Sequence, residues 1–368
     1  MATLLSDYGP LGNNKMDPNT SWRISFLRFP LVLGVVWIHA GSMQINASYS
    51  TATINSSPFL EFVRRLISEG IARVAVPLFF GIAGYLFFAE KPYSNRLYFY
   101  GLKRRLNTLL LPLIVWNALY IALYAALESL PITKGLFAGA SSRQVVHFGL
   151  FDYLDALFGF RVGPIAYQFW FIRDLLVLIL LVPVFWCART FMPALLAVLF
   201  VLWMSNLKPV PWPSVSATLF FAIGLYLSWA QIDLNALARF RLAFLSFFAI
   251  GLIYDAAFYV SDDHWFYKLV ILSGTLGVWY GIDAFRNHPW QCKVVDYGKA
   301  SFYLFAAHDP FLTLLRKLCY RMIGSRGDIS FLTLYLAVPI IAIIVLLLSY
   351  RVFSVVAPKA LAFVTGGR

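Results

Sequence analysis

The sequence of 368 residues is poor in charge and in cysteine. Only 13% of its residues are charged and 60% are hydrophobic, whereas soluble domains carry about 25% charged residues. This composition excludes a soluble enzyme, a disordered chain and a coiled coil. Long unbroken apolar runs also exclude a porin-type barrel, whose strands alternate in polarity. Cys187, Cys292 and Cys319 are far apart, so they indicate neither a metal site nor a disulfide framework.

Long apolar segments fill most of the chain instead. A membrane helix needs about 20 apolar residues, and the sequence predicts an all-α polytopic membrane protein with about ten transmembrane helices. We expect a flexible cytoplasmic tail over residues 1–20 and a single transmembrane domain over 21–368. The predicted spans are 24–44, 69–89, 107–127, 168–187, 191–206, 214–230, 242–260, 267–285, 299–318 and 331–355.

The loop after the second predicted span sets the expected orientation, because cytoplasmic loops are enriched in Lys and Arg. This loop carries Glu90 as its one carboxylate. Its cations are Lys91, Arg96, Lys103, Arg104 and Arg105. We therefore expect the loop to be cytoplasmic, and an even number of spans places both termini on the same side. Other cations then fall outside, namely Arg64, Arg65, Arg316, Lys317, Arg321 and Arg326.

The net charge of +13 is large for so apolar a chain. The sequence contains no soluble basic module, so we expect no nucleic-acid partner. Anionic membrane lipids, phosphorylated cofactors and phosphate-linked lipid substrates are the partners that such a charge favours.

Arg28 and His39 lie in the first predicted span, where ionisable residues are costly and indicate function. Eleven residues make three helical turns plus about 20°, so both side chains lie on one helix face, about 16 Å apart along the axis. An anion-binding group and a titratable imidazole therefore occupy the two ends of one face. The structural alternative is an arginine that reaches the headgroups and a histidine bonded to a neighbouring helix.

Two further polar pairs lie within predicted spans. His308 and Asp309 occur in the ninth span, and Arg173 and Asp174 occur in the fourth. Each pair is a candidate for catalysis, and each is equally well explained as a structural contact between helices. The run Lys103-Arg104-Arg105 also has two explanations: it sets the topology, or it binds a phosphorylated ligand beside Arg28.

Two predicted outer connections, 45–68 and 128–167, are longer than turns. The second is rich in glycine and aromatic residues. Long loops in compact proteins are often functional, and the aromatic content predicts a segment that packs on the protein, as a lid or a re-entrant segment.

Six motifs follow one another in the order of a known family. Arg28 and His39 match its first-span signature of Arg, ten residues and His. The sequence therefore resembles the membrane-bound acyltransferase-3 family, which O-acylates bacterial cell-surface carbohydrates. Thr108 and Ala83 depart from the usual Arg and Ser of its third and second spans. The other matching segments are Arg73–Phe88, Lys103–Asn117, Phe169–Phe185, Phe220–Ser228 and Ser301–Leu312.

The resemblance implies an O-acetyltransferase of the bacterial inner membrane that needs no metal. Its donor is an acyl-CoA, taken here as acetyl-CoA, bound from the cytoplasm. Its acceptor is a sugar hydroxyl of an exopolysaccharide or a lipid-linked oligosaccharide. The residues expected to bind the donor are Arg28, Arg73, Lys103, Arg104, Arg105 and Tyr303.

The same resemblance gives His39 the central chemical role. It either takes the proton of the sugar hydroxyl or carries the acyl group as a covalent relay. Arg173 or Tyr303 is expected to polarise the thioester oxygen. Two other classes of protein fit the composition: a transporter or flippase of a polyprenyl-linked saccharide, and a structural membrane subunit.

Overall fold

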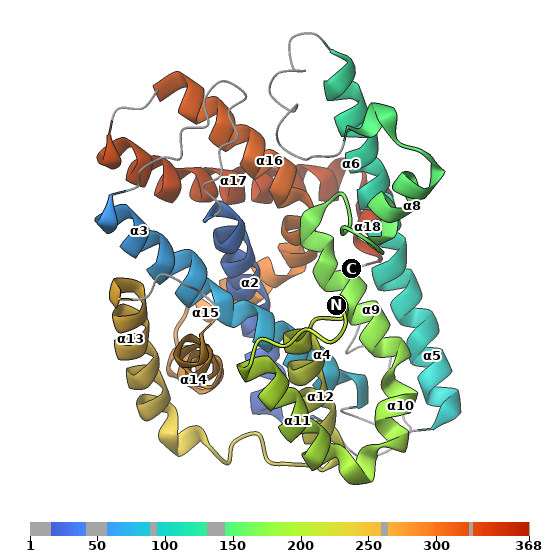
Figure 1. The fold of residues 1–368 in the computed structure, drawn as a ribbon, viewed down its shortest axis with the longest axis vertical. Helices are drawn as coiled ribbons and strands as arrows, with labels where there is room; N and C mark the ends of the chain where they lie inside the picture. Colours follow the sequence, from blue (N-terminus) through green and yellow to red (C-terminus); the bar gives the residue numbers. More distant parts are fainter. Residues whose placement is uncertain are drawn as a thin grey trace.

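The computed structural model describes residues 16–41, 57–88, 94–130, 144–258, 264–323 and 327–367. Every regular element within these ranges is a helix, which confirms the predicted all-α class. Figure 1 shows the helices packed side by side around the helix α2 (Pro18–Ala40). Part of the predicted tail, residues 1–15, lies outside the described residues.

Helix α2 begins earlier than the sequence predicts. Pro18 stands at the first helical position, and the side chain of Asp17 accepts a hydrogen bond from the backbone N–H of Thr20 at 3.1 Å. Both features are typical of a helix start. The last three residues of the predicted tail are therefore helical, and α2 contacts α4, α16 and α17 along its length.

Two long helical runs follow α2, and each changes its winding part-way. A π-helical segment, η1, and a 3-10 segment, η2, interrupt the first run, and a π-helical segment, η3, interrupts the second. Such irregular turns in a helix often occur at functional sites. The first run consists of α3 (Pro58–Arg64), η1 (Arg65–Gly70), η2 (Ile71–Val74) and α4 (Ala75–Phe88). The second consists of α5 (Asn95–Arg105), η3 (Leu106–Leu110) and α6 (Leu111–Ser129).

The rest of the chain supplies the outer helices and a second helix beside α2. In Figure 1, α16 and α17 lie side by side above α2, and α13 and α14 lie beside each other below them. These elements are η4 (Val145–His147), α8 (Leu150–Phe158), η5 (Tyr167–Phe169), α9 (Trp170–Leu180), α10 (Val182–Cys187), η6 (Arg189–Phe191), α11 (Met192–Met204), α12 (Val215–Trp229), η7 (Ala238–Phe240), α13 (Arg241–Phe258), α14 (Trp265–Gly281), η8 (Ile282–Phe285), α15 (Gln291–Tyr297), η9 (Gly298–Ala300), α16 (Ser301–Ile323), α17 (Asp328–Val356) and α18 (Pro358–Thr365).

Helices α4 and α12 approach each other at glycines. A Cβ atom on Gly84 would collide with the carbonyl oxygen of Phe221, and one on Gly224 would collide with that of Gly81. Small residues let membrane helices pack with their backbones in contact. This contact holds α4, which lines the cavity described below, against the rest of the protein.

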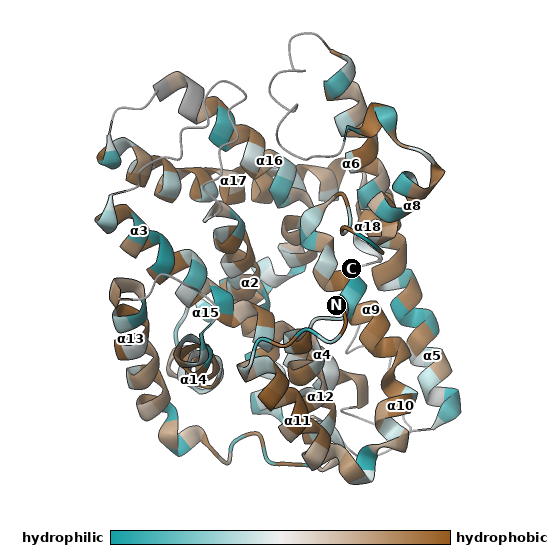
Figure 2. Ribbon diagram, viewed as in Figure 1, coloured by the Kyte–Doolittle hydropathy of each residue, from teal (hydrophilic) through white to brown (hydrophobic). Residues whose placement is uncertain are grey.

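The apolar helices make the chain a multi-pass membrane protein. Each of the ten predicted segments contains helix in its described residues, but only five of the described helices are long and apolar enough to cross a membrane, so the number of ten spans stays a prediction. The five are Pro18–Ala40, Pro58–Phe88, Tyr98–Ser129, Ala238–Phe258 and Asp328–Val356. Figure 2 shows apolar residues along α11, α13 and α17. Ile250 of α13 and Ile344 of α17 are 70% and 52% exposed, as expected for side chains that face lipid.

The described part of the second long loop, residues 144–167, packs on α6 as its aromatic content predicts. Helix α8 ends at Gly159, whose φ of 73° is left-handed and favours glycine. Asn117 of α6 then holds both sides of the turn: its Nδ2 donates to the carbonyl of Leu157 at 3.0 Å, and its Oδ1 accepts from the N–H of Ala166 at 2.9 Å. The turn leads directly into η5, which reaches the cavity.

Candidate active site

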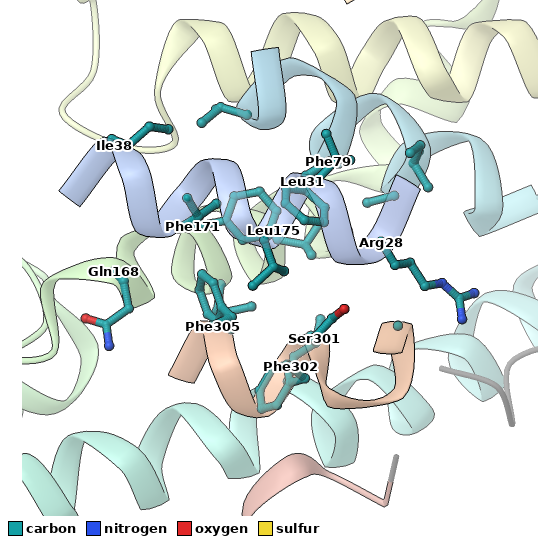
Figure 3. Close-up of a pocket in the computed structure, with 18 of the residues that line it drawn as sticks. Arg28, Leu31, Ile38, Phe79, Gln168, Phe171, Leu175, Ser301, Phe302 and Phe305 are labelled. Carbon is teal, nitrogen blue, oxygen red and sulfur yellow. The ribbon is translucent and has the colours of Figure 1, made fainter. Parts of the chain in front are cut away.

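A cavity of about 1020 Å³ lies between α2, α4, α9 and α16. Both Arg28 and His39 line it, because α2 turns the face that carries them toward the cavity. Leu31 and Val35 occupy the same face between them. Figure 3 shows Arg28 and Gln168 on opposite sides of the view, with apolar side chains between them.

Positive charge gathers at the Arg28 end of the cavity. The side chain of Arg28 lies next to Gly298. A Cβ atom added to Gly298 would stand 3.7 Å from the Cβ of Arg28. Arg104 and Arg105 also line this end, and the guanidinium of Arg105 stands 5.7 Å above the ring of Phe87. Gly367 lines the same cavity. Guanidinium groups in this setting are suited to binding phosphate oxygens.

Apolar side chains line the middle of the cavity. Figure 3 shows Phe79, Phe171, Leu175 and Phe305 between the two polar ends. These residues come from α4, α9 and α16, and all of them line the cavity. A passage of this kind accommodates an uncharged chain and excludes bulk water.

His39 meets a second histidine at the far end of this passage. The rings of His39 and His308 lie 5.0 Å apart between centroids, and Tyr167 packs edge-on to His39 at 5.8 Å. His308 is fully buried, and its Nδ1 lies 2.8 Å from the carbonyl oxygen of Phe305 and 3.1 Å from that of Leu304. Because carbonyl oxygens only accept, Nδ1 carries the hydrogen of the neutral ring. Its Nε2 is left with a lone pair and has no hydrogen-bond partner among the residues that the structure describes.

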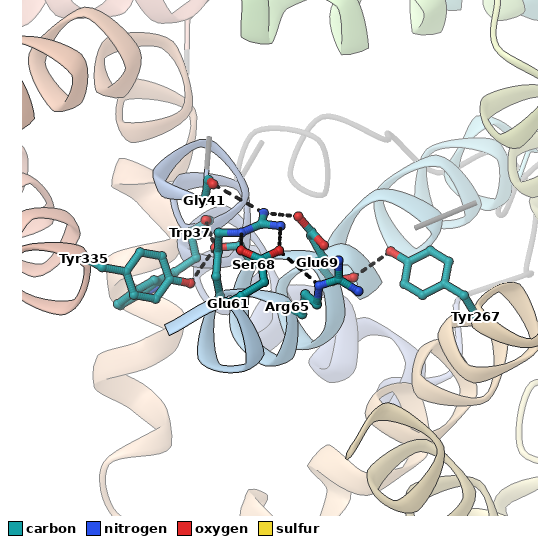
Figure 4. Close-up of polar contacts among 9 residues, drawn as sticks. Trp37, Gly41, Glu61, Arg65, Ser68, Glu69, Tyr267 and Tyr335 are labelled. Carbon is teal, nitrogen blue, oxygen red and sulfur yellow. Dashed lines mark hydrogen bonds and ion pairs between the residues drawn. The ribbon is translucent and has the colours of Figure 1, made fainter. Parts of the chain in front are cut away.

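A polar network fixes the end of α2 that carries His39. Ser68 donates from its Oγ to the carbonyl oxygen of Trp37 at 2.6 Å and contacts the hydroxyl of Tyr335 at 2.6 Å. Arg64 reaches the carbonyl oxygen of Gly41 at 3.4 Å and pairs with Glu69. Figure 4 shows these contacts around the last turn of α2. They add side-chain donors to the carbonyl groups of this helix end, among them that of Trp37, which also accepts from the N–H of Gly41 at 3.2 Å.

Comparisons with known proteins identify the family of this chain. The sequence model of the acyltransferase-3 family, described as an acyltransferase domain, matches residues 22–351. The chain belongs to the acyltransferase-3 family. It is also 27% identical to the succinoglycan biosynthesis protein ExoH of Rhizobium meliloti (strain 1021), over 96% of this chain and 94% of that protein. No solved structure matches the chain.

The cavity does not include every residue that the sequence suggests. His308 lies beside His39 but is itself outside the cavity lining. Lys103 is exposed and lies outside the cavity lining, although Arg104 and Arg105 are part of it. Tyr303 also lies outside the lining, and its hydroxyl stands 3.1 Å from the Oγ of Ser349, between α16 and α17. Neither position supports a role in donor binding.

Arg173 and Asp174 form a structural contact outside the cavity lining. They pair with each other at 2.8 Å, and Arg173 donates to the carbonyl oxygen of Gly159 at 2.7 Å. Asp174 accepts from the N–H of Ser214 at 2.8 Å and so connects α9 to the start of α12. Neither residue lines the cavity, so the structure gives no support to Arg173 as the group that polarises the thioester.

Arg73 lines the cavity near His39, and not at the end that holds Arg28. The charges of Arg73 and Arg316 both act on the His39 imidazole. Asp309 also lines this end and accepts from the Oγ1 of Thr313 at 3.5 Å. The sequence of α16 could have predicted which of its side chains line this end of the cavity. Phe305, Asp309, Thr313 and Lys317 are spaced four residues apart, and residues at this spacing are neighbours on the helix surface.

Proposed function

We propose that this protein is a membrane O-acetyltransferase that moves the acetyl group of cytoplasmic acetyl-CoA to a sugar hydroxyl. The acceptor is an exopolysaccharide or a lipid-linked oligosaccharide. Membership of the acyltransferase-3 family supports the reaction class, and similarity to the succinoglycan biosynthesis protein ExoH supports a polysaccharide acceptor. The observation that carries the proposal is the cavity that joins Arg28 to His39.

The proposal includes a topology of ten spans in the bacterial inner membrane, with both termini in the cytoplasm. The cations of residues 96–105 support this orientation, because such residues stay on the cytoplasmic side. Arg28 then lies toward the cytoplasm, and His39 lies about 16 Å farther across the membrane.

Arg28, Arg104 and Arg105 hold the phosphate groups of the donor in this proposal. Arginine is suited to the task because its planar guanidinium donates two hydrogen bonds at once to phosphate oxygens. The pantetheine arm follows the apolar passage between α2, α9 and α16 and brings the thioester to His39. Lys103 takes no part, because it is exposed outside the cavity.

His39 acts as the general base. It takes the proton of the sugar hydroxyl while the hydroxyl oxygen bonds to the thioester carbonyl carbon. The C–S bond then breaks, and the CoA sulfur leaves as a thiol with the proton that His39 received. Arg73 stabilises the negative charge that develops on the carbonyl oxygen. General-base catalysis of this kind is worth about 10² to 10⁴ in rate.

His308 is a positioning residue in this scheme. Its Nδ1 is held by two backbone carbonyls, so its Nε2 presents a lone pair on the side of the ring without other described partners. The structure holds no hydrogen bond between the two described rings. In the proposed reaction a turn of the His39 ring lets one of its N–H groups donate to this lone pair, which leaves the other nitrogen of His39 as the base. The orientation of His39 thereby depends on a second, neutral histidine.

Thiol release tests the proposal directly. The purified protein in lipid nanodiscs, given acetyl-CoA and an oligosaccharide acceptor, is expected to release free CoA and to form an acetylated sugar. His39→Ala is expected to abolish both products while the protein stays folded. A flippase or a structural subunit consumes no donor, so acceptor-dependent release of CoA separates these classes. Full activity in a folded His39→Ala variant contradicts the mechanism.

The covalent relay has its own test. Incubation with radiolabelled acetyl-CoA in the absence of acceptor is expected to leave no label on the protein, because His39 acts as a base. Label that is retained on wild-type protein and lost in His39→Ala indicates an acyl-histidine intermediate instead.

A further inference from the structure

The cavity continues past His39 toward Thr313, Arg316 and Lys317, and Gln168 lies at the level of the histidines, near Ala306. We name this part of the cavity the outer chamber. Helix α16 gives its position. The start of α16 follows Gly298, which lies against Arg28, and His308 lies beside His39. Lys317 is nine residues beyond His308, which is about 13 Å farther along the helix. The outer chamber therefore lies on the side of His39 opposite to Arg28.

The outer chamber has an excess of positive charge. Arg73, Arg316 and Lys317 line the cavity around and beyond His39, against Asp309 as the carboxylate in the same lining. The charge of Asp309 acts on Arg316. Arg316 and Lys317 are only partly exposed, and cations in a partly buried site attract anions more strongly than cations on an open surface.

Gln168 adds a fixed hydrogen-bond acceptor to this end of the cavity. It is 1% exposed, and its Nε2 lies 2.8 Å from the Tyr120 hydroxyl and 3.0 Å from the carbonyl oxygen of Ala306. Because a carbonyl only accepts, the amide nitrogen must face Ala306. The Oε1 atom then has no hydrogen-bond partner among the described parts of the chain. A buried acceptor without a partner is costly, and a sugar hydroxyl is a suitable donor.

We infer that the outer chamber binds an acidic glycan, with Arg316 and Lys317 holding its phosphate or carboxylate and Gln168 accepting a hydroxyl. The inference rests on the proposed function, in which the acceptor reaches His39 from this side. It deepens that function by naming the acceptor class: a sugar chain that carries a negative charge within a few residues of the hydroxyl to be acetylated.

Equilibrium binding in the absence of acetyl-CoA tests this site. The probes are a neutral oligosaccharide, the same oligosaccharide with a phosphate at its reducing end, and the same oligosaccharide with one sugar oxidised to a uronic acid. Wild-type protein in nanodiscs is expected to bind at least one charged probe about tenfold more tightly than the neutral probe, which corresponds to one charge-assisted contact. The charged probe that binds more tightly identifies phosphate or carboxylate as the anion.

Charge-removing and charge-keeping variants assign the contact to these residues. Arg316→Gln and Lys317→Gln are each expected to remove most of the preference for the charged probe, whereas Lys317→Arg keeps it. Lys208→Gln removes an exposed cation outside the cavity lining and is the matched control. Gln168→Leu is expected to weaken the binding of the neutral probe and of the charged probes by the same factor.

The two proposals fail in different ways. The acidic-glycan site is overturned if the wild type binds neutral and charged probes equally, or if Lys317→Gln lowers the affinity for both by the same factor. Either result counts against the site even if CoA is released with another acceptor. Conversely, binding of the charged probe that depends on Arg316 and Lys317 supports the site even if no acetyl group is transferred. The acetyl-CoA affinity of each variant serves as the check of folding.

Discussion

Single side chains decide the chemistry of this cavity, and their charge is the first property to test. Arg104 and Lys103 are neighbours in the sequence, but only Arg104 lines the cavity. We expect Arg104→Ala to raise the KM for acetyl-CoA about tenfold or more, since a hydrogen bond to a charged group is worth about 1.5–3 kcal/mol. Lys103→Ala is expected to leave this KM unchanged. Steady-state kinetics of the two variants measures the difference, and equal effects contradict the assigned phosphate site.

The same scale includes the histidine pair. We expect His308→Phe to lower kcat by about tenfold or more while the KM for acetyl-CoA stays near its wild-type value, because the proposed phosphate contacts are made by other residues. Loss of the neighbouring acceptor also changes the orientation of His39, so the pH dependence of kcat is expected to shift. A purely structural role predicts a lower yield of folded protein, with the pH profile of the folded fraction unchanged. Kinetics across pH, normalised to folded protein, separates these outcomes.

Contacts between elements decide whether the cavity exists at all. Helices α4 and α12 touch where Gly224 faces the backbone of Gly81 and Tyr85. We expect Gly224→Ala to destabilise the protein by about 1–3 kcal/mol, the usual cost of overpacking. Gly101→Ala is the matched control, because its Cβ would meet only the Phe87 ring at 3.9 Å. Thermal unfolding in detergent compares the two variants, and equal melting temperatures contradict the close backbone contact.

The Arg173–Asp174 pair also acts at the scale of elements. Removing one partner of a buried ion pair costs about 3–5 kcal/mol, and Asp174 is fully buried. We therefore expect Asp174→Asn to lower the melting temperature and the yield. The protein that does fold is expected to keep the wild-type KM for acetyl-CoA, because the pair lies outside the cavity lining. A stable variant with no activity assigns the pair to catalysis instead.

The orientation in the membrane is a property of the whole molecule. The proposed topology places Cys187 and Cys292 on the cytoplasmic side, and both thiols are exposed. In spheroplasts with an intact membrane, we expect a membrane-impermeant maleimide to leave both unlabelled until the membrane is permeabilised. Cys319 is replaced by Ser to remove a third thiol.

Lys208→Cys supplies the opposite control, because residue 208 lies in a predicted outer loop. It is expected to react in intact spheroplasts. Labelling of Cys187 and Cys292 before permeabilisation would mean that the orientation is the reverse of the proposed one. Arg28 would then face the side of the membrane without acetyl-CoA.

Much of the fold follows from local sequence patterns. The apolar runs of the sequence predict helices, and the structure has a helix in each of these segments. The physical reason is that a chain in lipid must satisfy its backbone hydrogen bonds within each helix. Arg28 and His39 share a face for an equally local reason, the helical repeat. The resemblance of the motifs to the acyltransferase-3 family is confirmed over residues 22–351.

Other parts of the site depend on contacts between distant segments. The ring of His308 lies beside that of His39 only because α16 packs against α2, across 269 residues of sequence. The sequence also gives no reason to separate Lys103 from Arg104, or to remove Tyr303 and Arg173 from the site, because charge and helical position look alike in each case. Burial and packing distinguish them, and these are properties of the assembled helices.

The sequence by itself determined that this chain is helical, lies in a membrane and carries a cation and an imidazole on one face of its first helix, because hydropathy and helical periodicity act between near neighbours. Only the tertiary structure decided that this face borders a cavity, that Arg104 reaches it, that Gln168 lines its histidine end, and that Lys317 extends it past His39. Those facts depend on how separate helices cross, and crossing is set by the side chains of both partners together.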